Sequence, residues 1–336
     1  MVVVLSCFLL LRFQEDPISL SSTSTSSTTA AAASLSTACH AVLAGNTSGT
    51  HKPASAPRTI LSMATRGNAE VKENVCSVLA VLRPTVDVLN VYWDSSEAPY
   101  GCLDRLNVTL ATKEEVFAHC REDLFPHHTE RQSLGTEAKF LWEVAGGFSS
   151  PGDVVFFIDD DIAYPVDYVS RLVAALDQHN ETVMVGVHGW NLREPFQDYF
   201  KNRTIRMFTG KIEADEVVHG LGSGTMAWRV PPRGGKKGGM TLPRDSYDTG
   251  GVFEFVNCGD LQVSLRAAQL HIPTVMVARD SGWLAHGVPT KVDRPGIFLL
   301  RDEEILRHKQ LLAALGQQVN PPPDAPSVAV KQISKQ

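Results

Sequence analysis

A run of five apolar residues that ends in three acids limits the possible folds of this chain more than any other segment. The run is Val154 to Ile158 (VVFFI), and Asp159, Asp160 and Asp161 follow it directly. A strand that is apolar at every position must be buried on both faces, which is typical of a central strand in a parallel sheet. The acids then mark the carboxyl end of this strand, where α/β sheets bind their ligands.

Strands and helices are predicted to alternate from residue 58 onward. Apolar, β-branched and aromatic runs indicate strands, and apolar residues at helical spacing indicate helices. The expected strands are 59–64, 86–93, 106–110, 154–158, 183–187, 226–230 and 274–278, and the expected helices are 70–82, 136–144, 165–176, 259–270 and about 303–315. This alternation predicts an α/β fold, a single Rossmann-type domain with a mainly parallel central sheet flanked by helices.

The acidic triplet is the first candidate functional site. Alternate side chains of an extended chain share a face, so we expect Asp159 and Asp161 to point one way and Asp160 the other. Two carboxylates at a strand end suit Mg²⁺ or Mn²⁺, which can keep open positions for a substrate diphosphate. The alternative is a solvated loop in which one Asp caps the next helix. We favour the metal, because three crowded acids repel one another and need a cation or a proton.

A resemblance to a known family begins at this triplet. The segment FFIDDDIAYPVDYVSRLV resembles the DXD region of GT-A-fold glycosyltransferases, especially a family-2-like, bacterial-type group with a D-D-D-I-x-Y-P-x-x-Y segment. Other segments resemble this group in the same order, across about residues 58–286: SMATRGNAEVKENVCSVL, VDVLNVYWD, LGTEAKFLW, VHGLGSGTMAWR and NCGDLQVSLRAAQLHIPTVMVARDSGWL. The resemblance implies a GT-A-like domain and a hexosyltransferase-type enzyme that uses a nucleotide-sugar donor with Mn²⁺ or Mg²⁺.

The resemblance also implies roles for two residues in the second half of the chain. Asp260 begins the helix 259–270 and would take the proton of the acceptor hydroxyl group if the reaction inverts. The alternative is an acid that is favourable at a helix N-terminus because of the helix dipole. Some GT-A enzymes recruit a C-terminal histidine as a further metal ligand, which makes His286 a candidate, although a surface-loop histidine is the more common case.

Five residues are candidates for holding the donor. Thr65 and Arg66 end the first expected strand and Asp94 ends the second, where contacts to the nucleotide are expected. Lys139 lies in the expected helix 136–144 and would reach the diphosphate as a mobile cation, unless it is a solvated helix lysine. Asp159 is expected to contact the donor as well as the metal.

Several further polar segments allow both a functional and a structural interpretation. The glycines of GLGSGT at 220–225 would let backbone N–H groups approach a ligand, but they equally suit a tight turn. His188, Trp190 and His219 are each either ligand contacts or structural residues. The stretch RGGKKGG at 233–239 lacks the phosphate-loop motif, so we interpret it as a flexible insertion.

The amino-terminal part differs in composition from the rest. Ser, Thr and Ala supply 17 of the 20 residues from 21 to 40, which predicts a disordered leader or linker over residues 1–57. Residues 1–11 resemble the apolar core of a signal peptide, but no Lys or Arg precedes them, so a targeting segment and an imperfect gene start both stay open. A GT-A-like domain at 58–300 and a C-terminal helix with a polar tail at 301–336 complete the expected organisation.

The six cysteines form no C-x-x-C pair, so a structural zinc site has no support. We expect mostly buried free thiols, because a chain of this length does not need disulfides. Four N-x-[ST] sequons, at Asn46, Asn107, Asn180 and Asn202, permit a secretory or Golgi location. A cytoplasmic location stays open as well.

Charge and hydropathy exclude two classes of protein. Lys and Arg total 31 against 37 Asp and Glu, for a net charge of −6, so no basic excess exists to bind nucleic acid. No apolar run approaches the roughly 18 to 20 residues that span a bilayer, so we expect no transmembrane segment. The expected partners are a nucleotide-sugar donor and a carbohydrate, lipid or protein acceptor.

Two other functions stay open at this point. One is a non-catalytic protein that binds a nucleotide sugar or a carbohydrate on the same fold. The other is a different metal-dependent nucleotide enzyme, such as a nucleotidyltransferase, although no glycine-rich basic loop follows the first strand.

Overall fold

The computed structural model describes residues 35–45, 56–67, 71–124, 134–146, 148–179, 183–194, 198–199, 201–231, 242, 258–287 and 309–316. The helices are α1 (Thr37–Ala44), α2 (Lys72–Leu82), α3 (Gly101–Arg105), α4 (Lys113–Leu124), α5 (Leu141–Ala145), α6 (Tyr168–Gln178) and α7 (Gly259–Gln269), with 3₁₀ turns η1 (Arg83–Thr85) and η2 (Gly135–Phe140). A further helical segment covers residues 309–316. None of the described helices is both long enough and apolar enough to cross a membrane.

The strands are short and divide among three sheets within the described residues. They are β1 (Thr59–Thr65), β2 (Val88–Trp93), β3 (Thr109–Thr112), β4 (Val154–Ile158), β5 (Ile162–Ala163), β6 (Met184–Gly186), β7 (Gly189–Leu192), β8 (Arg203–Arg206), β9 (Glu216–Val218), β10 (Gly220–Leu221), β11 (Thr225–Arg229), β12 (Thr274–Met276) and β13 (Ala285–His286). The central sheet has the order β3-β2-β1-β4-β11-β6-β12-β9, and the two small sheets are β10-β7-β8 and β13-β5.

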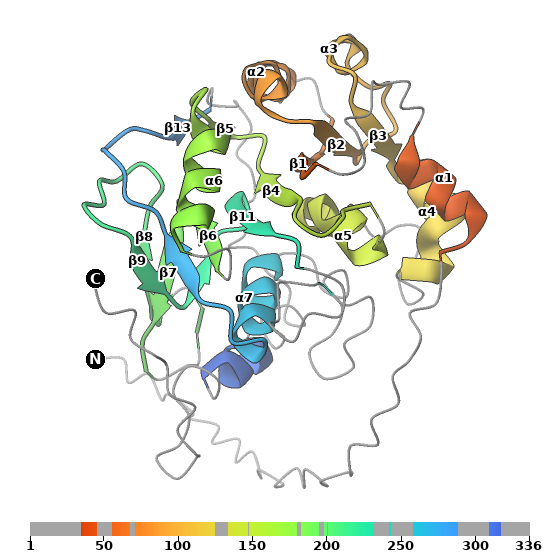
Figure 1. The fold of residues 1–336 in the computed structure, drawn as a ribbon. Coiled ribbons are helices and arrows are strands. Elements are labelled where there is room, and N and C mark those ends of the chain that lie inside the picture. The colour runs from red at the N-terminus through yellow and green to blue at the C-terminus, as the bar shows by residue number, and fades with distance from the viewer. Residues whose placement is uncertain are drawn as a thin grey trace, which may run out of the picture. The chain divides into compact units, whose positions relative to one another are not determined.

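The central sheet is mixed but mostly parallel. The strands β3, β2, β1 and β4 pair in parallel, as do β6 and β12. β11 runs antiparallel to both of its neighbours, β4 and β6, and β9 runs antiparallel to β12. The predicted α/β class with a large, mainly parallel sheet and flanking helices is therefore confirmed (Figure 1).

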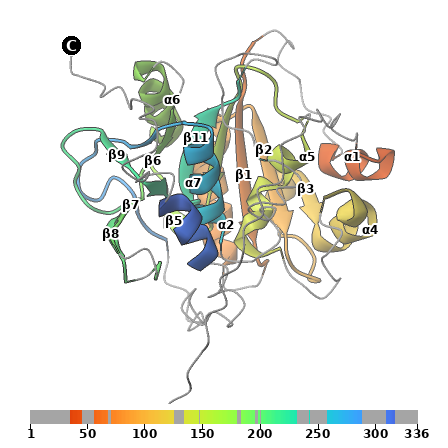
Figure 2. The same cartoon turned by 90° about the horizontal axis from the view of Figure 1, so that it is seen from below.

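The buried strand β4 explains how the two faces of the sheet are covered. Val154, Phe156 and Ile158 pack into one apolar cluster together with residues of α2 and α6. Val155 and Phe157 pack into a second cluster with residues of α1, α4, α5 and α7. All five side chains are at most 2% exposed, as the apolar run predicts for a strand between two helical layers. Helices flank the strands of the central sheet in the view of Figure 2.

A smaller third cluster lies beside α7. It joins the buried Trp190 of β7 and Tyr199 to Leu261 and Leu265 of α7 and to leucines of the helical segment 309–316. Trp190 and Tyr199 meet edge to face, with ring centroids 5.5 Å apart. Trp190 is therefore a core aromatic, which agrees with the structural interpretation of the HGW segment.

Three predicted elements differ in detail from those observed. The expected helix 136–144 is a 3₁₀ turn, η2, that continues into the short α5. The helix expected from 165 begins at Tyr168, because Pro165 accepts a hydrogen bond from Tyr168 N at 3.1 Å in a turn before it. The strand expected at 226–230 is β11, which runs against the parallel direction of β4.

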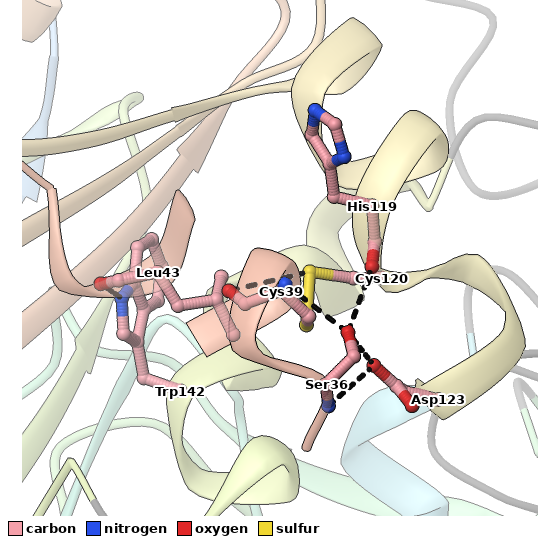
Figure 3. The surroundings of a disulfide bond; sticks show 7 residues. All are labelled: Ser36, Cys39, Leu43, His119, Cys120, Asp123 and Trp142. Atoms are coloured by element: carbon pink, nitrogen blue, oxygen red, sulfur yellow. Dashed lines mark hydrogen bonds between the residues drawn. A yellow bond between two sulfur atoms is a disulfide. The ribbon is translucent and has the colours of Figure 1, made fainter. Parts of the chain in front are cut away.

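The first described segment corrects the prediction for the leader. Residues 37–44 form α1, whose Cys39 and Leu43 are fully buried in the core. Ser36 caps the helix by accepting a hydrogen bond from Cys39 N, and its hydroxyl donates to Asp123 of α4 at 2.6 Å. Trp142 Nε1 donates to the Leu43 carbonyl at 2.9 Å (Figure 3). The expectation of disorder is therefore wrong for this segment, since composition does not register such long-range contacts.

The rest of the expected leader, residues 1–34 and 46–55, lies outside the described residues, as does most of the expected C-terminal region. The boundaries proposed at residues 57 and 300 remain predictions.

The expectation of free thiols is also wrong for four cysteines. Cys39 of α1 bonds Cys120 of α4, with Cα atoms 4.6 Å apart (Figure 3). Cys76 of α2 bonds Cys102 of α3, with Cα atoms 6.0 Å apart. Cys258 is a buried free thiol. Spacing along the chain did not indicate the pairs, which are separated by 81 and 26 residues.

Candidate functional site

The acidic triplet continues β4 from the middle of the central sheet. Asp159 and Asp161 line one cavity, whereas Asp160 points elsewhere and accepts a hydrogen bond from Thr65 Oγ1 at 2.8 Å. Asp160 and Asp161 lie in a turn after β4, so the side chains do separate, but not through the extended chain on which the prediction rested. The triplet therefore has two distinct sides, one facing the cavity and one facing the end of β1.

The cavity has a volume of about 280 Å³ and collects side chains from distant parts of the chain. Its lining includes Asp159, Asp161, His188, Tyr199, Arg203, Ser223, Gly224, Asp260 and His286. The candidate base and all three candidate metal ligands thus face a common space. The Asp159 carboxylate faces this cavity and contacts Lys139 and the glycine turn, so it is not the side chain of a fully solvated loop.

Lys139 is the first group that holds Asp159. Its side chain is 1% exposed, and its Nζ forms an ion pair with Asp159 Oδ1 and donates to Ser223 Oγ at 3.4 Å. Lys139 is therefore not a solvated helix lysine. It neutralises the acid at the point where mutual repulsion in the triplet was expected to require a cation.

Gly224 is the second group that shapes the position of Asp159. A Cβ atom on Gly224 would overlap the Asp159 carboxylate, so only glycine leaves room for it. The Gly222 carbonyl accepts from Thr225 N at 3.0 Å, which makes 222–225 a tight turn. The turn interpretation of GLGSGT is correct, and the turn also lines the cavity.

Tyr164 joins the two segments through its hydroxyl group. The Asp159 main-chain N–H donates to Tyr164 Oη at 2.9 Å, and the hydroxyl donates to the Gly224 carbonyl at 2.5 Å. Burial raises the pKa of Tyr164 well above its usual range, so the phenol stays protonated and can donate. The acidic triplet and the glycine turn are thereby fixed relative to each other.

Asp260 is fixed at the start of α7. Its Oδ1 accepts from Ser223 N at 2.7 Å, and its Oδ2 accepts from the buried Tyr199 hydroxyl at 3.4 Å. Gly259 N donates to Glu137, a 2% exposed carboxylate, at 3.0 Å. Asp260 therefore bonds to two residues that line the cavity, in addition to lying at the N-terminus of its own helix.

His286 reaches the site through main-chain pairing. β13 pairs with β5, so that His286 lies opposite Ile162, and Gly287 N donates to the Asp161 carbonyl at 2.7 Å. The imidazole is exposed, lines the cavity and meets Phe208 edge to face at 4.9 Å. Main-chain hydrogen bonds therefore hold His286 beside the triplet, although more than a hundred residues separate them in the sequence.

The three candidates for nucleotide contacts lie beside this cavity but do not line it. Thr65 ends β1 and is buried, whereas Arg66 is exposed. Asp94 follows β2, and its main-chain N–H donates to the Thr65 carbonyl at 2.9 Å. Asp94 also forms an ion pair with Lys113 at 3.4 Å. The three residues lie at the carboxyl ends of β1 and β2, and Thr65 contacts the acidic triplet through Asp160.

The two histidines near the glycine turn differ from each other. His188 lines the cavity, and burial lowers its pKa because desolvation outweighs the nearby negative charge of Asp260. His219 accepts a hydrogen bond from Leu192 N at 3.0 Å through Nδ1 and is outside the lining, so its structural interpretation is correct. The stretch 233–239 lies outside the described residues.

The cavity offers a divalent cation oxygen and nitrogen donors from separate segments of the chain. Among the described residues, no three His, Cys, Asp or Glu side chains are arranged to hold a metal ion together. Asp159, Asp161 and His286 nevertheless line one cavity, and carboxylate oxygen with imidazole nitrogen suits Mn²⁺. These residues fit a cation that keeps open coordination positions, and they do not form a closed protein site.

Sequence reasoning missed Glu137, Tyr164, Tyr199 and Arg203. Tyr164 is part of the D-D-D-I-x-Y-P-x-x-Y segment and Glu137 of LGTEAKFLW, but neither was given a role, and Tyr199 and Arg203 lie in no quoted segment. Arg203 covers the Tyr199 ring, with its guanidinium carbon 3.7 Å from the ring centroid. Only contacts between segments reveal that these residues support or line the cavity.

Comparison with known proteins finds no matching family model and no matching curated protein. Among solved structures, the chain is similar to glucosyl-3-phosphoglycerate synthase from Mycobacterium tuberculosis in complex with Mn²⁺, uridine diphosphate and glucosyl-3-phosphoglycerate, with 14% identity over 82% of this chain and 88% of that chain and a TM-score of 0.39. It is also similar to the mannosyltransferase PcManGT from Pyrobaculum calidifontis in complex with GDP-Man and Mn²⁺, with 13% identity over 84% of this chain and 76% of that chain and a TM-score of 0.39. Scores at this level establish no activity for this chain.

Proposed function

We propose that this protein is a metal-dependent glycosyltransferase that transfers a sugar from a nucleotide-sugar donor to an acceptor hydroxyl group. The observation that carries the proposal is the convergence of Asp159, Asp161, His286 and Asp260 on one cavity. The order of motifs that resembles GT-A glycosyltransferases supports it independently of the cavity. Neither the sugar nor the base of the donor follows from these residues.

Asp159 and Asp161 would hold Mn²⁺ or Mg²⁺, with His286 as a further ligand. A divalent cation held there would neutralise the charge that develops on the leaving diphosphate. Lys139 is buried and already ion-paired with Asp159, so binding of the cation would release its ammonium group toward a diphosphate oxygen. The donor phosphates would then lie between the acidic triplet and the glycine turn.

Asp260 would accept the proton of the acceptor hydroxyl group as that oxygen attacks the sugar. Ser223 N donates to Asp260 Oδ1, and the Tyr199 hydroxyl donates to Oδ2. These two hydrogen bonds orient the carboxylate in the cavity. Tyr199 remains a neutral donor, because burial and the neighbouring Asp260 raise its pKa well above its usual range. A base placed in this way suits an inverting displacement.

The nucleotide would extend along the carboxyl ends of β1 and β2. Thr65 Oγ1 donates to Asp160, and the Asp94 main-chain N–H donates to the Thr65 carbonyl, so the ends of β1 and β2 are linked to each other and to the triplet. Arg66 is exposed at the same edge. We assign the nucleotide contacts to Thr65, Arg66 and Asp94 on this basis.

The test is donor hydrolysis and sugar transfer by the full chain. A panel of nucleotide sugars would be incubated with Mn²⁺ or with EDTA, and release of nucleoside diphosphate would be measured. We expect slow, metal-dependent release from one donor, lost in Asp161→Ala. The matched control is Asp104→Ala, an exposed acid on α3 outside the cavity lining, which should retain the activity.

The alternatives predict different products. A nucleotidyltransferase would release pyrophosphate in place of a nucleoside diphosphate. A non-catalytic binding protein would bind the donor in the presence of Mn²⁺ without any turnover, and Asp260→Asn would change no measured rate. No release from any donor, together with no Mn²⁺-dependent binding, would contradict the proposed metal site.

A further inference from the structure

Two disulfides connect helices on the outside of the central sheet. Four of the five described cysteines are paired, and both pairs have Cα separations, 4.6 and 6.0 Å, within the range that a disulfide requires. Such bonds persist in oxidising compartments, whereas cytosolic glutathione keeps thiols reduced. The pairing therefore points to folding in a compartment that contains thiol–disulfide oxidoreductases.

One sequon lies beside the second disulfide in a position open to modification. Asn107 is exposed and has a φ of 50°. It lies in the turn after α3, where its main-chain N–H donates to the Asp104 carbonyl at 3.3 Å. Cys102 lies five residues before it, and Thr109 supplies the hydroxyl residue of the sequon. Thr109 is buried in the folded chain, but transfer of a glycan precedes folding, so this burial is no obstacle.

The other described sequon is less suitable. Asn202 is half-buried, and both its N–H and its carbonyl bond neighbouring main-chain groups, at 2.8 and 2.7 Å. It also precedes Arg203 of the cavity lining, so a glycan there would crowd the site. Asn46 and Asn180 lie outside the described residues.

We propose that Asn107 carries an N-linked glycan, added while the chain passes through an oxidising secretory compartment. The side-chain nitrogen forms a bond to the anomeric carbon of an oligosaccharide that is linked to a lipid diphosphate. The bond between this carbon and the diphosphate oxygen breaks, the amide loses one proton, and the lipid diphosphate leaves. Each disulfide forms by exchange with an oxidised protein disulfide, which takes up the two electrons of the thiol pair.

A glycan at Asn107 is compatible with an open cavity. Residue 107 precedes β3, the edge strand of the central sheet, and β2 and β1 separate β3 from β4. The acidic triplet follows the carboxyl end of β4, whereas Asn107 lies before the amino end of the parallel strand β3. The modification site and the candidate active site therefore occupy different regions of the domain.

The direct test uses the full chain isolated from the cells that produce it. Removal of N-glycans by a glycosidase in ¹⁸O-labelled water would convert a modified Asn107 into labelled aspartate, which peptide mass spectrometry detects. We expect the label at residue 107 and, without reduction, a cross-linked peptide pair that contains Cys76 and Cys102. Unlabelled Asn107 overturns the proposal, and so do cysteines that alkylate fully before reduction.

Variants of the full chain, directed into the secretory pathway of a eukaryotic cell, locate the modification. Asn107→Asp tolerates the positive φ and should abolish the glycan-dependent shift in electrophoretic mobility, whereas Thr109→Ser keeps the sequon and should retain it. Asn202→Gln is the control and should also retain the shift. A shift that survives Asn107→Asp would assign the glycan elsewhere and contradict the proposal.

Discussion

At the scale of single residues, the position of the Asp159 carboxylate depends on three neighbours. Lys139 pairs with it, Gly224 leaves space for it, and Tyr164 ties its main chain to the glycine turn. Each neighbour acts differently, by charge, by volume or by hydrogen bonding. Single substitutions can therefore separate the three contributions.

Substitution of Tyr164 tests the hydrogen-bonding contribution. Tyr164→Phe keeps the ring but leaves the Gly224 carbonyl and the Asp159 N–H without this partner, which costs about 1–3 kcal/mol of folding stability. We expect affinity for Mn²⁺ to fall about tenfold, as for other groups that orient a metal ligand. Electron paramagnetic resonance of free Mn²⁺ and urea unfolding measure the two effects.

Tyr168→Phe is the matched control for this substitution. The Tyr168 hydroxyl is buried without a hydrogen-bond partner among the described residues, and its ring contacts Tyr164 edge to face at 4.8 Å. Removing this hydroxyl should leave Mn²⁺ affinity unchanged and stability equal or higher. Equal losses of Mn²⁺ affinity in both variants would show that ring packing, and not the hydroxyl bridge, positions Asp159.

Substitution of Gly224 tests the volume contribution. Gly224→Ala forces the Asp159 carboxylate away from its observed position, so we expect Mn²⁺ binding to be lost in a calorimetric titration. Gly101→Ala is the control, because a Cβ there meets no atom within 4 Å. That variant should bind Mn²⁺ as the original chain does and gain up to about 1 kcal/mol of stability. Unchanged binding in Gly224→Ala would remove Asp159 from the metal site.

Glu143 makes stability depend on pH. Burial raises its pKa from 4.5 to about 7, against a smaller opposing effect of the Ser149 hydroxyl. The folded chain therefore holds this proton more tightly than the unfolded chain, so the free energy of unfolding should fall as pH rises from about 4.5 to about 7 and then level off. Glu143→Gln should flatten this part of the profile of melting temperature against pH. An identical slope in the variant would assign the effect to other groups.

At the scale of elements, α1 shows how a short helix is held without strong helical propensity. Its buried residues pack with α4, Ser36 bonds Asp123, and the Cys39–Cys120 disulfide closes an 81-residue separation. A chain that starts at residue 58 would lack this helix and expose part of the core. Experiments on the folded domain therefore need residues from at least 35 onward.

The two disulfides should differ in what they contribute. Cross-linking a longer loop removes more entropy from the unfolded chain, so the 81-residue closure should stabilise by about 1 kcal/mol more than the 26-residue closure. Urea unfolding of Cys39→Ala/Cys120→Ala and of Cys76→Ala/Cys102→Ala, both in the full chain, measures this difference. A larger loss from the shorter loop would show that contacts in the folded state outweigh the loop entropy.

At the scale of the whole molecule, the candidate site exists only where distant segments meet. Asp159 comes from the end of β4, Asp260 from the start of α7 and His286 from β13, and the antiparallel β11 delivers the glycine turn beside β4. Binding across these segments should stabilise the whole domain. A ligand that contacts them together is therefore expected to alter global unfolding as well as local order.

Thermal unfolding with ligands tests this expectation. Mn²⁺ together with a nucleoside diphosphate should raise the melting temperature, since a ligand at a hundred times its Kd stabilises the folded chain by about 2.7 kcal/mol. EDTA should reverse the shift, and Asp161→Ala should show none, whereas Asp104→Ala should respond like the original chain. An equal shift in Asp161→Ala would place the binding site elsewhere.

The sequence alone determined the α/β class and the central strand β4 that ends at the acidic triplet. These features follow from local periodicity, because five consecutive apolar residues require burial on both faces. The first two strands and α7 were predicted within about two residues for the same reason. The orientation of the triplet was predicted from an extended chain, whereas Asp160 and Asp161 lie in a turn.

Only the tertiary structure decided which residues surround the triplet. The buried ion pair of Lys139, the Tyr164 bridge, the cysteine pairs and the position of His286 all join segments far apart in the chain. The direction of β11 was likewise unpredictable, because an apolar run reads the same in a parallel and an antiparallel strand. Such features depend on contacts between segments that are far apart in the chain. A local sequence pattern shows which side of a helix or strand is buried, but it does not show which residues pack against that side.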